Sequence, residues 1–143
     1  MRLGLVLAAL TAAMVTSACL GWLPTQPSKK DIAGDQKREA AYQATMKSYS
    51  EALKPGTTRR EVEDYLRARQ TTFGRWGGTL KDPAQTDVIT IGKLWKPWFC
   101  SEHNVYIKFH FSRLNQHADP TQGVLDSDVL TNIEREDRLE GCL

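Results

Sequence analysis

The chain has 143 residues, which is enough for one domain of ordinary size once an N-terminal targeting segment is set aside. Its 19 Lys and Arg nearly balance its 17 Asp and Glu, and the basic residues are scattered along the chain. This pattern argues against a dedicated patch of basic residues for nucleic acid or for a membrane surface.

The N-terminus has the layout of a secretory signal peptide. Arg2 is followed by an apolar run over residues 3–18 that ends in small residues. The run has 16 residues, fewer than the roughly 20 that a membrane-spanning helix needs. We therefore expect residues 1–18 to be an export signal that is cleaved off.

Cys19 follows Thr16-Ser17-Ala18, and this arrangement resembles the bacterial lipobox, in which the cysteine is acylated and becomes the new N-terminus. The lipobox prefers Leu at the position of Thr16, so two outcomes stay open. Acylation of Cys19 would hold the protein on a membrane, whereas a plain cut after Ala18 would release it. Residues 19–34 contain two prolines and are expected to form the lipid-anchored, flexible tether.

Two helices are predicted next. Over residues 35–53, one buried face follows the spacing i, i+4, i+7, i+11, and its members are Tyr42, Met46, Tyr49 and Leu53. Pro55-Gly56 ends this helix, since Pro cannot continue the hydrogen-bond ladder. A second helix begins at Thr58, which forms a capping box with Glu61. Its apolar side is predicted to carry Val62, Tyr65, Leu66 and Arg69.

A family resemblance lies in this helix-turn-helix. Residues 53–66, Leu-Lys-Pro-Gly-Thr-Thr-Arg-Arg-Glu-Val-Glu-Asp-Tyr-Leu, resemble the signature of the BamE/SmpA-like small envelope lipoproteins. The resemblance implies that the two helices precede a three-stranded antiparallel sheet. It also implies a non-enzymatic protein that supports outer-membrane assembly by contact with other envelope proteins.

The second half of the chain is predicted to form β-strands. Residues 105–112 alternate strictly, with Val105, Ile107, Phe109 and Phe111 on one side, which is typical of a half-buried antiparallel strand. Further strands are predicted over residues 86–92, 95–100 and 124–136. In the last of these, Val129, Thr131, Ile133 and Arg135 are expected on one face, and Leu130, Asn132 and Glu134 on the other. The large rings Trp95, Trp98 and Phe99 are expected to be buried as a lid on the core.

Three cysteines leave a natural pair once Cys19 is assigned to the lipid. Cys100 and Cys142 are then expected to form a disulfide in an oxidising compartment. Closing this loop would stabilise the domain by about 4 kcal/mol in the chain-entropy model.

No pattern predicts catalytic residues, a metal site or a cofactor. His103, His110 and His117 recur every seven residues, but on the predicted strand and turns they do not align. Ser101-Glu102-His103 contains the residue types of a hydrolase, yet the groups of a catalytic triad converge from separate elements. The acidic residues between positions 126 and 137 lack the glycine and terminal glutamate of a calcium-binding loop.

We therefore expect one α+β domain over residues 35–143, with two N-terminal helices packed on a three- to four-stranded antiparallel sheet. Its expected function is that of a lipoprotein on the periplasmic side of the outer membrane, where it binds or scaffolds another envelope protein. A secreted binding or inhibitory module is the first alternative, and an enzyme or ligand-binding domain is the second. The residues expected to contact the partner are Arg59, Arg60, Tyr106, Lys108 and His110.

Overall fold

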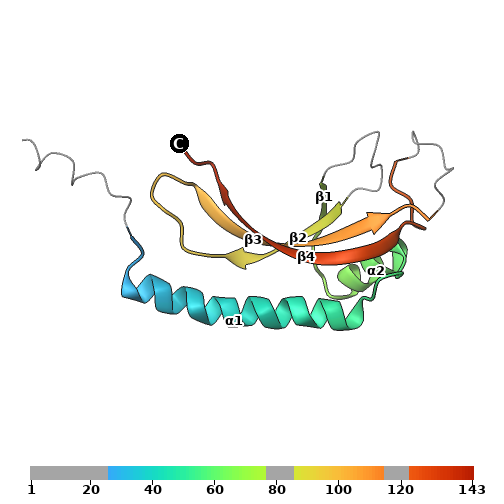
Figure 1. The fold of residues 1–143 in the computed structure, drawn as a ribbon, viewed down its shortest axis with the longest axis horizontal. Helices are drawn as coiled ribbons and strands as arrows, with labels where there is room; N and C mark the ends of the chain where they lie inside the picture. Colours follow the sequence, from blue (N-terminus) through green and yellow to red (C-terminus); the bar gives the residue numbers. More distant parts are fainter. Residues whose placement is uncertain (1–25, 77–85, 115–122) are drawn as a thin grey trace, which may run out of the picture.

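The computed structural model describes residues 26–76, 86–114 and 123–143. The elements in chain order are α1 (Lys29–Ala52), α2 (Arg59–Ala68), β1 (Gly74–Trp76), β2 (Thr86–Lys93), β3 (Glu102–Ser112) and β4 (Val129–Glu140). The strands form one antiparallel sheet in the order β1-β2-β3-β4, and both helices lie against the same face of it (Figure 1). The predicted α+β architecture is confirmed.

Helix α1 begins at Lys29, six residues before the predicted start. Ser28 caps this end, because its hydroxyl accepts a hydrogen bond from the amide of Asp31 while the Asp31 carboxylate accepts one from the amide of Ser28. Such a capping box satisfies amides that a helix end otherwise leaves free. Residues 29–34, expected in the tether, are therefore helical.

Helix α2 follows after a tight turn, and Thr58 and Glu61 form the predicted capping box. Gly56 has a φ of +93°, a left-handed conformation that glycine adopts readily. Its amide donates to the carbonyl of Leu130 at 2.8 Å, so the turn is tied to the start of β4. Arg69, predicted on the apolar side of α2, is the exposed C-cap residue, and its guanidinium carbon lies 4.3 Å from the centroid of the Tyr65 ring.

The hydrophobic core lies between the helices and the sheet. Helix α1 presents the predicted face, with Tyr42, Tyr49 and Leu53 buried and Met46 packed against the core. The other buried core members come from α2 and three strands: Val62, Leu66, Ile89, Ile107, Phe109, Phe111 and Leu130.

The side chains of strand β3 alternate as predicted, with the odd-numbered apolar ones on the helix side and the even-numbered ones on the opposite face. The strand is more than half buried, however, because Asn104 and Tyr106 on the opposite face are only 5% and 7% exposed. The pairing with β4 contains a bulge between His110 and Phe111. The bulge adds one residue to β4, so Leu130 pairs with Phe111 and Ile133 with Phe109, both on the helix side. The prediction that Leu130 and Ile133 lie on opposite faces is therefore wrong.

Two local predictions also fail. Strand β1 was expected to be loop, yet Trp76 pairs with Thr86 of β2. Residues 95–100, expected to form a strand, are a loop between β2 and β3. In that loop Trp98 is 65% exposed instead of buried.

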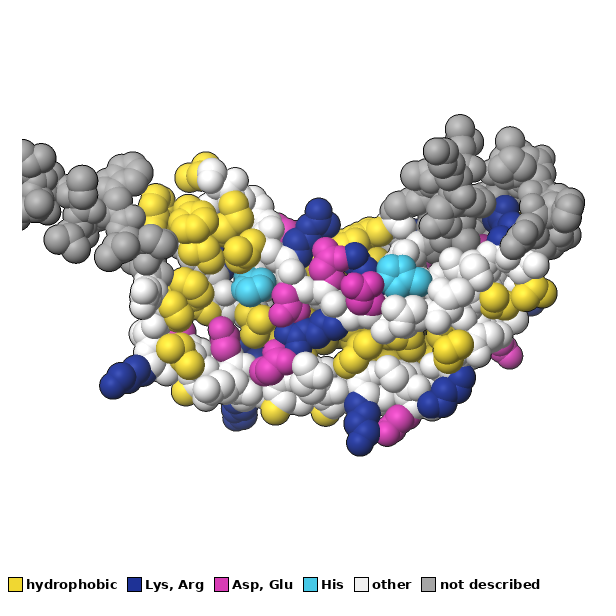
Figure 2. Space-filling model, viewed as in Figure 1, with side chains coloured by type: hydrophobic (Ala, Val, Ile, Leu, Met, Phe, Trp, Pro, Cys, Tyr) yellow, Lys and Arg dark blue, Asp and Glu magenta, His cyan; other side chains and the backbone are white. Residues whose placement is uncertain are grey.

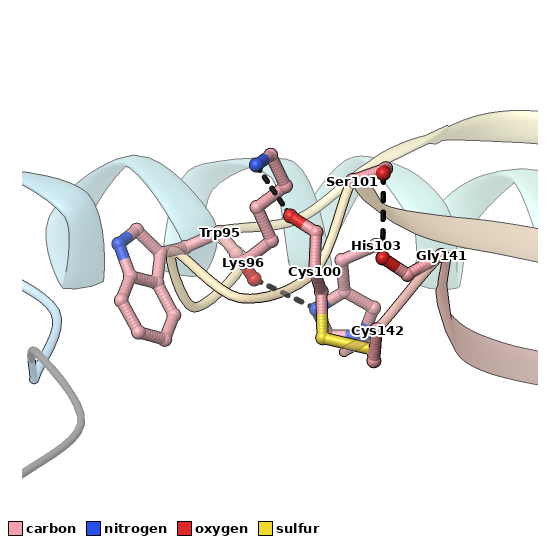
Figure 3. Close-up of a disulfide and its surroundings, with 7 residues drawn as sticks. All are labelled: Trp95, Lys96, Cys100, Ser101, His103, Gly141 and Cys142. Carbon is pink, nitrogen blue, oxygen red and sulfur yellow. Dashed lines mark hydrogen bonds between the residues drawn. A yellow bond between two sulfur atoms is a disulfide. The ribbon is translucent and has the colours of Figure 1, made fainter.

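The disulfide between Cys100 and Cys142 is present and joins residues 42 apart in sequence (Figure 3). Backbone hydrogen bonds reinforce this junction: the amide of Ser101 donates to Glu140 at 2.9 Å, and that of Leu143 donates to Phe99 at 2.9 Å. The end of the chain is thus fastened to the loop that leads into β3.

Removing the disulfide should weaken the domain measurably. In Cys100→Ser with Cys142→Ser, we expect the free energy of unfolding to fall by about 2–4 kcal/mol, because the unfolded chain regains loop entropy. Urea unfolding of the two proteins measures the difference. Dithiothreitol should destabilise the wild type by a similar amount and leave the variant unchanged; equal stability of variant and wild type would show that the disulfide adds nothing.

Candidate protein-contact surface

The sheet face that points away from the helices is the candidate contact surface, and no element in the described parts of the chain covers it. We call it the open face; its members are Trp76, Val88, Thr90, Asn104, Tyr106, Lys108, His110, Glu134, Glu136, Arg138 and Glu140. Strand register puts Tyr106 opposite Thr90 and Glu136, and Lys108 opposite Val88 and Glu134. Figure 2 shows charged side chains gathered on this side of the sheet.

An aromatic pair forms the centre of the open face. The rings of Trp76 and Tyr106 meet edge to face with centroids 4.7 Å apart. Two cations flank the Trp76 ring: the Lys108 ammonium lies 5.8 Å from its centroid and the Arg138 guanidinium carbon 5.4 Å. Both are within the range at which a cation is attracted to an aromatic face.

Tyr106 is held in place by a hydrogen-bond network. Its hydroxyl donates to Oε1 of Glu140 at 2.8 Å, and the side-chain amide of Asn104 donates to Oε2 of the same carboxylate at 3.0 Å. Burial, together with the Glu140 hydrogen bond, raises the pKa of the Tyr106 phenol above its usual value. Tyr106 is only 7% exposed, so it is a fixed, neutral side chain whose hydroxyl proton is already donated to Glu140.

Charged residues of β3 and β4 pair across the open face. Lys108 forms an ion pair with Glu136, and Nε2 of His110 lies 3.0 Å from Oε2 of Glu134. Nδ1 of His110 contacts the Thr86 hydroxyl at 3.3 Å. Partly exposed pairs of this kind contribute little to stability, so a partner could exchange them without a large cost.

A groove runs beside the aromatic pair at the β1 edge of the sheet. It has a volume of about 590 Å³, and its wall includes residues 70–74, Trp76, Val88, Thr90 and Tyr106. Polar side chains and aromatic rings share this wall, which suits a surface that takes up part of another molecule.

Arg59 does not belong to any contact surface. Its side chain is fully buried, with Nη1 donating to Oδ1 of Asp87 at 2.5 Å and the guanidinium 3.9 Å from the centroid of the Phe111 ring. Its Nε lies 3.9 Å from Oδ2 of Asp128. The prediction of Arg59 as a contact residue is therefore wrong: the residue ties the start of α2 to β2 and to Asp128, which immediately precedes β4.

Arg60 is exposed and pairs with Asp126 at 2.6 Å, but α2 lies on the helix side of the sheet (Figure 1). The structure thus brings Tyr106, Lys108 and His110 together and separates Arg60 from them. Sequence reasoning missed Trp76, because the three-residue strand that positions it gives no periodic signal.

Arg59 is part of a buried charge cluster, which also contains Glu63, Asp87 and Asp128. Arginines at its margin contribute further contacts: Arg75 donates to Oε1 of Glu63 at 2.7 Å, and Arg113 donates to Oδ1 of Asp128 at 3.3 Å. Burial raises the pKa of Asp87 to about 6, against the attraction of Arg59.

The residue types of hydrolytic or metal chemistry do not converge in the described parts of the chain. The Ser101 hydroxyl donates to the carbonyl of Gly141, whereas the His103 ring bonds the carbonyl of Trp95 (Figure 3). No group of three His, Cys, Asp or Glu within those parts could hold a metal ion. His117 and Cys19 lie outside the described residues. None of the described helices is both long and apolar enough to cross a bilayer.

Comparisons with protein families, with curated proteins and with solved structures found no match. The open face is therefore interpreted from its own residues.

Arg59 and Arg60 are adjacent and should respond very differently to the same substitution. Arg59→Met leaves Asp87 and Asp128 buried without their central cation, so we expect a loss of about 3–5 kcal/mol in the free energy of unfolding. Arg60→Met breaks only an exposed pair and should cost less than about 1 kcal/mol. Chemical denaturation of both variants measures the contrast, and comparable losses would contradict the structural role given to Arg59.

Asp87 should make stability depend on pH. Its pKa of about 6 in the folded protein lies above the usual aspartate value of 3.8, so the folded state binds the proton more tightly than the unfolded state does. The stabilisation from this proton is complete below about pH 4 and is lost as pH rises through 6. Relative to Asp87→Asn, the wild-type free energy of unfolding should thus fall between pH 4 and pH 6; urea midpoints that show no such relative change would exclude the raised pKa.

Proposed function

We propose that this protein is a non-enzymatic, exported lipoprotein that binds or scaffolds another protein of the bacterial cell envelope, using the open face. The observation that carries the proposal is the aromatic pair Trp76 and Tyr106, flanked by Lys108 and Arg138, on a sheet face that no described element covers. Trp, Tyr and Arg are the residues that most often dominate binding energy at protein interfaces.

The open face is also stiff enough for recognition. All four strands carry its members, and Tyr106 is fixed by its bond to Glu140. A surface on paired strands loses little conformational freedom on binding, so more of the contact energy appears as affinity. The groove of about 590 Å³ beside Trp76 would admit a side chain or loop of the partner.

The export leader, Cys19 and the resemblance of residues 53–66 to the BamE/SmpA-like envelope lipoproteins support the location and the partner class. That resemblance also makes support of outer-membrane assembly our proposal for the process served. If Cys19 is not acylated, the same face would serve a secreted binding module.

Site-specific photo-crosslinking in the producing cells tests the contact. A photoreactive residue at Thr90 or Glu134, both exposed on the open face, should give a discrete adduct with one envelope protein. The same residue at Lys37 or Lys47, exposed on α1, should give none. Trp76→Ala should lower the adduct yield about tenfold or more, since interface hot spots contribute 2 kcal/mol or more.

The proposed contact fails if the open-face positions give no adduct, or if they and the α1 positions give the same adducts in similar yield. Circular dichroism and the absence of free thiols at Cys100 and Cys142 verify that each variant is folded.

Palmitate labelling tests the lipid anchor separately. We expect label on the full chain and none on Cys19→Ala. A soluble chain that begins at residue 19 or later and carries no label would support the secreted alternative instead.

A further inference from the structure

Large apolar side chains are exposed at the end of the molecule that holds the disulfide. Four of them are Ile32, Trp98, Leu139 and Leu143, which are 44%, 65%, 45% and 101% exposed. We call this set the anchor-end patch. Figure 2 shows hydrophobic side chains gathered at this end of the molecule, whereas charged ones gather on the open face.

The anchor-end patch is built from three segments that are fastened together. The Cys100–Cys142 disulfide and the bond from the amide of Leu143 to Phe99 join the C-terminal residues to the loop that carries Trp98. The amide of Trp95 donates to Oδ1 of Asp35 at 3.1 Å, which joins the same loop to the first turns of α1. The backbone segments that carry these apolar side chains are therefore held together.

The point at which the chain from Cys19 enters α1 indicates which surface this patch contacts. The described chain enters α1 at this same end (Figure 1). Cys19 is ten residues before Lys29, and an extended chain of that length spans at most about 36 Å. An acyl group on Cys19 would thus keep this end of the domain within reach of the bilayer surface.

Charge at this end also suits a membrane surface. Lys29, Lys30 and Lys96 are exposed there, and the Lys96 ammonium also donates to the carbonyl of Cys100 at 2.6 Å. Of the nearby carboxylates, Asp35 forms an ion pair with Arg38, whereas Asp31 keeps its negative charge and caps α1 with Ser28. Tryptophan prefers the headgroup region of a bilayer, and lysines close to anionic lipids are attracted to them.

We propose that the anchor-end patch rests on the headgroup region of an anionic lipid bilayer. The inference rests on the proposed function, because the lipid anchor brings this end to the membrane. Trp98 and Leu143 insert between headgroups, and the lysines contact lipid phosphates. In this orientation the long axis of the domain points away from the bilayer, and the open face stays accessible to a protein partner.

A soluble chain separates this contact from the acyl anchor. The chain from residue 19 onward with Cys19→Ser contains every described helix and strand and cannot be acylated at that position. It is sedimented with vesicles of phosphatidylcholine containing about a quarter phosphatidylglycerol, and with vesicles of phosphatidylcholine alone. We expect binding to the mixed vesicles and weaker binding to the neutral ones, by about fivefold for each lysine that contacts the surface.

Two matched substitutions locate the contact. Trp98→Ser with Leu143→Ser should weaken binding to the mixed vesicles by about tenfold or more, because the buried apolar area is lost. Leu114→Ser removes a side chain that is 75% exposed outside the patch and should bind like the reference chain. Thiol titration and urea midpoints check that all three proteins keep the disulfide and the fold.

The proposal is overturned if the reference chain binds neither kind of vesicle, or if Leu114→Ser weakens binding as much as the double substitution. It is also overturned if the chain instead forms a dimer that the double substitution dissociates. Each of these results leaves the palmitate labelling of Cys19 in the full chain unaffected, so failure of this inference is distinguishable from failure of the lipoprotein function.

Discussion

The alternation of side chains along β3 gives the sheet two different sides, a helix side that forms the core and an open face. Val105, Ile107 and Phe109 are completely buried on the helix side, and removing that apolar surface from water is the main force holding the helices to the sheet. The residues between them must point the opposite way, because successive side chains of a strand alternate. The same rule that builds the core therefore produces the open face.

Charges stabilise the two sides in different ways. On the helix side, Arg59 lies among apolar residues and is compensated by Asp87 and Asp128, so it fixes where α2 meets the sheet. On the open face, Lys108 and His110 lie in partly exposed pairs with Glu136 and Glu134. The buried pairs hold the fold together, whereas the partly exposed pairs could be replaced by ion pairs with a binding partner.

Signals that depend on neighbours in the sequence could be predicted. The alternation of β3, the capping box at Thr58 and the apolar stripe of α1 each involve residues a few positions apart, and each is confirmed. The pairing of Cys100 with Cys142 was predicted by assigning Cys19 to the proposed lipid, which left these two cysteines as the pair. The earlier start of α1 had its own signal, the capping box of Ser28 with Asp31.

Features that depend on distant partners could not be predicted. The inward direction of Leu130 follows from a bulge opposite His110, which exists only in the paired register. Arg59 can be buried because Asp87 on β2 compensates its charge, and this partner is 28 positions away in the sequence. Likewise, Trp76 reaches the open face only because a short strand pairs with β2.

The central claim is that adjacent residues of β3 serve opposite sides of the sheet, and paired alanine substitutions at Ile107 and Lys108 test it most directly. We expect Ile107→Ala to lower the free energy of unfolding by about 2–5 kcal/mol, because it leaves a cavity in the core. Lys108→Ala should lower it by less than about 1 kcal/mol, because only a partly exposed ion pair is lost. Losses of equal size at the two positions would contradict the division of the sheet into a core side and an open face.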